Sequence, residues 1–185
     1  RWKRVFRLSV FSLVVGALAL DMGLSWLYVS ALVAPGCQGT PAPLSGWPAP
    51  EEWTLPLENG VRLRAWYYPS TNGAAVVVLG GQGGARGNAL PPAEPLLRAG
   101  YGVLQIDTRA CAAPPALVTL GYREAEDAAA GAAFLGTRPE VRPGRIGVLG
   151  FSMGGVAAIR AAARHPEFAA IAAEGGFFNL GADFV

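Results

Sequence analysis

Residues 146–155 read Ile146-Gly147-Val148-Leu149-Gly150-Phe151-Ser152-Met153-Gly154-Gly155. The apolar run at the start predicts a buried strand, and the Ala-rich residues 156–163 that follow predict a helix. Between them lies a Gly-x-Ser-x-Gly turn, in which glycines flank a serine because side chains there would collide with neighbouring elements. The sequence therefore predicts Ser152 as a nucleophile whose hydroxyl projects above a sheet. The amide of Met153, at the helix N-terminus, is the predicted donor to a developing oxyanion.

A structural alternative is a Gly-rich turn in which Ser152 only caps the helix. The chain contains 25 glycines, so the pattern alone arises easily by chance. The strand before the serine and the helix after it are the context that the motif requires, and they favour the nucleophile.

Length and composition limit the remaining possibilities. The 185 residues suffice for one stable domain, 52% of them are hydrophobic, and the net charge is only +2. After the first seven residues the cationic side chains are scattered, so we expect no nucleic-acid partner. Cys37 and Cys111 show neither a disulfide framework nor metal-ligand spacing. We expect two isolated thiols, no metal and no organic cofactor.

The N-terminal end is predicted to anchor the chain in a membrane. Residues 1–7 are basic, and residues 8–34 are apolar apart from Asp21. This apolar segment is long enough for a transmembrane helix. A cleaved signal peptide is the alternative, but the apolar segment is too long for one and no clear cleavage site follows it. The positive charge predicts a single-pass protein with a cytoplasmic N-terminus and an extracytoplasmic domain.

The rest of the chain predicts an α/β fold. Residues 35–52 are Pro-rich and are expected to form a linker. An Asn-Gly turn at 58–60 predicts an antiparallel hairpin from residues 53–57 and 61–68. Buried strands then alternate with helices, which predicts a mostly parallel sheet covered on both faces. The predicted strands are 74–79, 101–106, 145–149 and 168–173, and the other predicted helices are 89–99 and 121–135.

The order of these elements resembles the α/β-hydrolase fold. The stretches that carry the resemblance are residues 76–84, 100–109 and 147–155. More narrowly, they resemble the membrane-anchored bacterial Bem46-like and dienelactone-hydrolase-like group. The resemblance covers residues 53–185, as the N-terminal part of such a domain. It implies Ser152 as the nucleophile, the backbone amides of Met153 and Gln82 as the oxyanion hole, and a small-molecule or acyl substrate.

The sequence departs from this family at several positions. Gly80 stands where a histidine is usual, and Cys111-Ala112 replaces a usual His-Gly pair. Cys111 has no nearby histidine, so we expect a loop thiol and not a nucleophile. These changes concern the packing of the loops more than the chemistry.

The catalytic base is the larger departure. The family order is serine, then acid, then histidine, yet no histidine follows His165. His165 is expected at the far end of the serine helix, roughly 20 Å from Ser152, where it would cap the helix. Glu174 and Asp183 are open candidates for the acid. We therefore expect the chain to be truncated, with the histidine and the acid beyond Val185.

The predicted function is a serine hydrolase that acts on an ester, thioester or amide carbonyl through an acyl-enzyme. Two alternatives remain: a non-catalytic binding protein of the same fold held at the membrane, and an acyltransferase that uses the same serine.

Overall fold

The computed structural model describes residues 1–39, 42–43, 45–86 and 93–176. The chain divides into two units, Arg1–Val33 and Ala34–Val185. The first unit is a single helix, α1 (Trp2–Val33), which has no buried residue. Its length and apolar composition meet the requirements for crossing a membrane, a property shared by anchors and signal sequences. The prediction of a long apolar helix is confirmed.

The first two strands of the second unit form a hairpin. Strands β1 (Glu51–Pro56) and β2 (Arg62–Tyr68) pair antiparallel, with Leu55 opposite Leu63. A short 3-10 turn, η1 (Glu58–Gly60), connects them where the Asn-Gly pair predicted a turn. The predicted hairpin is confirmed, although β1 starts at Glu51, inside the range assigned to the linker.

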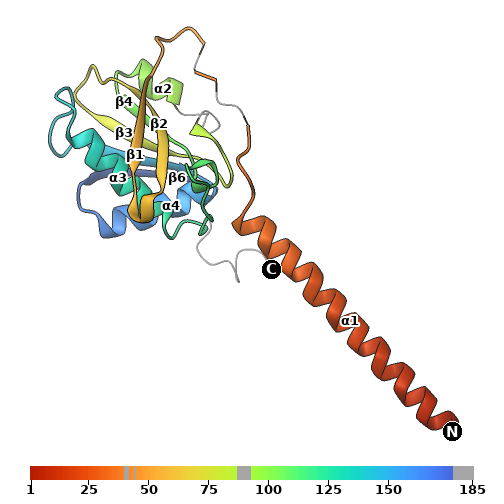
Figure 1. The fold of residues 1–185 in the computed structure, drawn as a ribbon. Coiled ribbons are helices and arrows are strands. Elements are labelled where there is room, and N and C mark those ends of the chain that lie inside the picture. Colours follow the sequence, from red (N-terminus) through yellow and green to blue (C-terminus); the bar gives the residue numbers. More distant parts are fainter. Residues whose placement is uncertain (40–41, 44, 87–92, 177–185) are drawn as a thin grey trace. The chain divides into compact units, whose positions relative to one another are not determined.

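Four further strands complete a six-stranded sheet with the order β1-β2-β4-β3-β5-β6 (Figure 1). The hairpin joins the sheet through antiparallel pairing of β2 with β4, and the remaining pairs are parallel. The carboxyl ends of the parallel strands therefore share one edge, where α/β folds bind their ligands. The bounds are β3 (Ala75–Leu79), β4 (Gly102–Ile106), β5 (Ile146–Phe151) and β6 (Phe168–Glu174).

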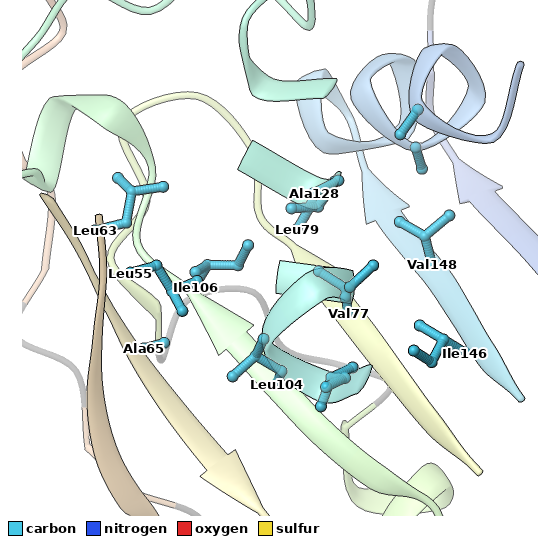
Figure 2. Close-up of a cluster of buried hydrophobic side chains, with 14 of the residues drawn as sticks. Leu55, Leu63, Ala65, Val77, Leu79, Leu104, Ile106, Ala128, Ile146 and Val148 are labelled. Carbon is cyan, nitrogen blue, oxygen red and sulfur yellow. The ribbon is translucent and has the colours of Figure 1, made fainter. Parts of the chain in front are cut away.

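Helices cover both faces of the inner strands, as the unbroken apolar strands predicted. The prediction of a buried strand at 168–173 is wrong, because β6 lies at the edge of the sheet and all its residues after Phe168 are exposed. On one face α3 (Glu124–Gly136) and α4 (Met153–Arg164) pack small side chains against the sheet (Figure 2). On the other face α2 (Ala93–Arg98) packs on Val78 and Val103. The main core contains Val77, Leu79, Leu104, Ile106, Val148, Ala128, Ala132, Ala157 and Ala161.

The abundance of alanine and glycine in α3 allows the helix to approach the sheet closely. A Cβ on Gly131 would lie only 3.1 Å from a methyl group of Val77. This close packing holds the first turn of α3 beside the carboxyl end of the sheet, where the candidate site lies.

Candidate active site

Ser152 lies at a sharp turn between β5 and α4. Its backbone has φ 54° and ψ −120°, a conformation that residues other than glycine rarely adopt. A Cβ on Gly150 would lie 1.9 Å from the carbonyl oxygen of Gly154, and a Cβ on Gly154 would lie 2.4 Å from that of Leu79. Only glycine fits on either side of the serine. The predicted strand-turn-helix arrangement is therefore confirmed.

The hydroxyl of Ser152 is not used to cap α4. Ser152 occupies the N-cap position, yet its side chain makes no capping hydrogen bond. Its backbone N–H donates to the carbonyl oxygen of Glu174 at 2.8 Å, which ties the turn to the end of β6. The side chain is half-buried. The capping alternative therefore does not account for a serine at this strained position.

The loop after β3 passes beside this serine. A Cβ on Gly81 would lie 3.7 Å from the Cβ of Ser152, and Gln82 is the next residue. Met153 is the first residue of α4, so its amide belongs to the first turn, whose N–H groups have no partner within the helix. Both residues predicted as oxyanion donors thus belong to segments that adjoin Ser152.

Asp107 holds the loop after β3 in place, a role that sequence analysis missed. This carboxylate follows β4 and is 3% exposed. It accepts hydrogen bonds from the backbone N–H of Arg86 at 2.7 Å, from the Arg86 guanidinium at 3.2 Å and from Arg64 Nε at 2.9 Å. A buried charge requires such partners, so Asp107 and Arg86 form one rigid support for the loop.

A second buried ion pair joins the segment after β4 to the first turn of α3. Arg109 donates from Nε to Asp127 at 2.8 Å and makes a second hydrogen bond to it from Nη2. Nearby Glu124 accepts hydrogen bonds from the hydroxyl and N–H of Thr119 and from the N–H of Gly121. Both carboxylates line a cavity of about 20 Å³ that also contacts Met153 and has room for about one water molecule. The carboxylates in the first turn of α3 therefore hold the segments around Arg109 and Thr119 in place, and they also interact favourably with the helix dipole.

Burial raises the pKa of Asp127 to about 7, although the two hydrogen bonds from Arg109 oppose the shift. Glu124 and Glu126 add to it by repulsion. Because this pKa exceeds the ordinary value near 4, the folded state binds a proton more tightly than the unfolded state between those pH values. The resulting stability is present below pH ~4 and is lost as the pH rises to 7.

We therefore expect the free energy of unfolding to fall between pH 5 and 7 by up to ~1.4 kcal/mol per pH unit. Urea denaturation at several pH values measures this slope, and Asp127→Asn is expected to remove it. Asp21→Asn, which changes a carboxyl outside the second unit, is the control and should retain the slope. A parent protein whose stability is flat or rises over this interval would contradict the assignment.

The expectation of two isolated thiols is wrong. Cys37 and Cys111 form a disulfide across 74 residues of sequence. Cys111 ends the short 3-10 helix η3 (Arg109–Cys111), and Cys37 lies just after the end of α1. The bond fixes the start of the Pro-rich segment to the carboxyl edge of the sheet. The spacing gave no hint of it because the pairing depends on tertiary structure.

The structure excludes His165 as the catalytic base and leaves the two candidate acids, Glu174 and Asp183, as hypotheses. His165 ends α4 as its C-cap, with its N–H donating to Ala161 at 2.8 Å and its ring 3.2 Å from Glu126. The 12-residue helix separates it from Ser152 by roughly 18 Å, so it is no base for that serine. Glu174 adjoins Ser152 through its backbone, and its role as an acid stays a hypothesis. Asp183 lies outside the described residues.

Within the described part of the chain, no group of three or more His, Cys, Asp or Glu side chains is placed to hold a metal ion. The described turn carries a serine hydroxyl at the N-terminus of α4.

Residues 48–184 match the family model of the X-Pro dipeptidyl-peptidases (S15 family). An uncharacterized protein of Mycobacterium tuberculosis (strain CDC 1551) is 31% identical over 140 residues. That match covers 74% of this chain and 50% of the relative, so the chain spans about half the length of the curated relatives it matches.

Solved structures share the fold. The Pyrococcus furiosus esterase Pf2001 is 30% identical with a TM-score of 0.68, over 78% of this chain and 56% of that one. A puromycin-hydrolysing peptidase of M. tuberculosis has a TM-score of 0.58 at 20% identity, over 77% of this chain and 26% of that one. At that identity the likeness concerns the fold alone.

Proposed function

The chain belongs to the X-Pro dipeptidyl-peptidase (S15) family within the α/β-hydrolase superfamily, and we propose from this membership that it is part of a serine hydrolase. Its substrate is an ester, thioester or amide, and Ser152 is the nucleophile. The backbone amides of Met153 and Gln82 form the oxyanion hole.

One observation carries the proposal: a strained, half-buried serine at the carboxyl edge of the sheet makes no capping hydrogen bond. Strained backbone conformations persist only where the surroundings enforce them, and they concentrate at functional sites. Here the close approach of backbone atoms at Gly150 and Gly154 on either side of the serine enforces the conformation.

The proposed reaction follows from this geometry. The hydroxyl oxygen of Ser152 attacks the carbonyl carbon, a base takes the hydroxyl proton, and the carbonyl oxygen becomes an oxyanion beside the two amides. The oxyanion collapses, the bond to the leaving group breaks, and the same proton passes to the departing alcohol, thiol or amine. Water then hydrolyses the acyl-enzyme. We propose that the base is a histidine oriented by an acid, as in the serine, acid and histidine order of this fold.

The relatives suggest two substrate classes, because the family is named for X-Pro peptidases and a solved relative is an esterase. Assays of the full-length protein with p-nitrophenyl esters and with X-Pro p-nitroanilides separate them. Hydrolysis of either series supports the proposal. Absence of hydrolysis together with absence of fluorophosphonate labelling would overturn it in favour of the binding protein. Transfer of the acyl group to an added alcohol in preference to water would identify the acyltransferase.

We further propose that the second unit lies outside the cytoplasm, anchored by α1. The disulfide supports this location, because disulfides persist in oxidising compartments and are rare in the cytosol.

The oxyanion role of Gln82 resides in its backbone, so the test must remove its N–H. We expect Gln82→Pro to lower kcat by ~10²–10³-fold, the usual effect of losing one such donor. Gln82→Ala keeps the N–H and is the matched control, with kcat within about threefold of the parent. Equal losses in both variants would assign the effect to the side chain or to folding, and equal activity would remove Gln82 from the oxyanion hole.

A further inference from the structure

The segment just before the Pro-rich stretch pairs with the loop that carries Gln82. The N–H of Gln38 donates to the carbonyl of Gly83 at 2.8 Å, and the N–H of Ala85 donates to the carbonyl of Gln38 at 3.3 Å. This is a parallel bridge between Gln38 and Gly84. The loop thus gains a strand-like partner from a part of the chain more than forty residues earlier.

The contact is close as well as hydrogen-bonded. Gly83 has φ +71°, and a Cβ there would lie 3.1 Å from the carbonyl oxygen of Gly36 and 3.3 Å from the side chain of Gln38. Residues 36–38 therefore cover the loop immediately after Gln82. A shift of residues 36–38 would therefore move Gly83 and with it the neighbouring Gln82.

The same loop is held on its other side by residues after β4. The N–H of Thr108 donates to the carbonyl of Gly84 at 3.1 Å, and the N–H of Cys111 donates to the carbonyl of Thr108 at 2.8 Å. Cys111 is 4% exposed and belongs to η3, which the ion pair of Arg109 anchors. Gly84 is thus clamped between the segment that follows β4 and Gln38.

The disulfide joins the two sides of this clamp. Cys37 directly precedes Gln38, and its partner Cys111 belongs to the segment that holds Gly84 from the other side. Two backbone hydrogen bonds stabilise a pairing only modestly, and ordering several residues of a Gly- and Pro-rich segment opposes it. A covalent bond at the adjacent residue holds the two segments within reach of each other, which raises their effective concentration and so keeps the pairing formed.

We propose that Cys37 is a positioning residue: through its disulfide to Cys111 it fastens residues 36–38 onto the Gly83–Ala85 loop and thereby holds the Gln82 amide at the oxyanion site. This inference rests on the proposed function, because Gln82 acts there as a donor. It adds that full activity requires the oxidised state.

The test compares oxidised and reduced full-length protein in detergent micelles. Dithiothreitol gives up two electrons and two protons and closes to its cyclic disulfide, while Cys37 and Cys111 become thiols. The matched control is the double variant Cys37→Ser/Cys111→Ser, which has no disulfide to reduce. Readouts are site-resolved amide hydrogen exchange and kcat and KM for the best ester or anilide.

On reduction we expect the amides of Gln38 and Ala85 to exchange at least ~10-fold faster, because local opening exposes them. The amide of Ala75, which donates to the carbonyl of Arg145 at the start of the interior strand β3, reports on opening of the sheet and should not change. We expect kcat to fall ~10–100-fold with KM within about threefold, since an oxyanion donor acts mainly in the transition state. The double variant should show the exchange rates and kcat of the reduced parent, with or without dithiothreitol. Reoxidation should restore kcat in the parent and should not change it in the double variant.

Three outcomes would overturn the inference. Unchanged exchange at Ala85 would show that the hydrogen bonds alone hold the loop. Equal acceleration at Ala75 would show that the disulfide acts on the stability of the whole sheet. Faster exchange at Gln38 and Ala85 with unchanged kcat would show that the disulfide holds the loop but that catalysis does not depend on it. If the oxidised protein turns over no substrate at all, the proposed function fails, and the exchange at Ala85 still decides whether the disulfide fastens the loop.

Discussion

Replacement of Ser152 by alanine is expected to lower hydrolysis by at least ~10⁴-fold in the full-length protein, the usual cost of removing a catalytic nucleophile. In the proposed reaction the covalent bond forms to this hydroxyl oxygen, which alanine lacks. We expect the residual rate to come only from binding and from the amides at the turn. Steady-state kinetics with the best ester or anilide, together with loss of fluorophosphonate labelling, measure the effect.

The same substitution should leave folding intact. Ser152 already adopts φ 54°, and alanine carries the same Cβ and so the same backbone strain. Its hydroxyl makes no capping hydrogen bond, so none is lost. We therefore expect Tm within about 2 °C of the parent. Activity retained within tenfold of the parent, in a folded variant, would exclude Ser152 as the nucleophile and with it the proposed mechanism.

The turn and the sheet were predictable from the sequence because their signals are local. The apolar run before Ser152 and the glycines around it specify a strand, a tight turn and a helix within a few residues. The Asn-Gly pair likewise specified the hairpin. Helix starts were less accurate. Helix α3 begins at Glu124, three residues later than predicted, because the Glu124 side chain accepts hydrogen bonds from Thr119 and Gly121.

The disulfide and the buried ion pairs were not predictable because they depend on chain segments that meet only after folding. Cys37 and Cys111 are separated by 74 residues, and each lies in a segment with no periodic pattern. Asp107 follows a strand in the sequence, where a carboxylate is often solvated. It is buried here because Arg64 and Arg86 approach it from β2 and from the loop after β3. A charged pair of this kind becomes visible only once the sheet order is known.

Gly150 offers the sharpest test of the turn geometry on which the serine depends. We expect Gly150→Ala to destabilise the fold by more than ~4 kcal/mol, a large part of the 5–15 kcal/mol typical of a whole domain. The new Cβ would lie 1.9 Å from the carbonyl oxygen of Gly154 and 2.2 Å from its carbonyl carbon. These atoms are backbone in the first turn of α4, so no side-chain rotation relieves the clash. Urea denaturation and the yield of soluble protein measure the loss.

Gly147→Ala is the matched control, because it makes the same substitution in the same buried strand. There the new Cβ would lie 3.4 Å from the carbonyl oxygen of Ala170, an ordinary contact. Alanine also restricts the unfolded chain more than glycine does, which offsets part of any cost, so we expect a change within ~1 kcal/mol. If Gly150→Ala were as stable as Gly147→Ala, β5 and the first turn of α4 could not lie as close together as the 1.9 Å contact requires. The backbone would then have room to relax, and nothing would hold Ser152 in its strained conformation.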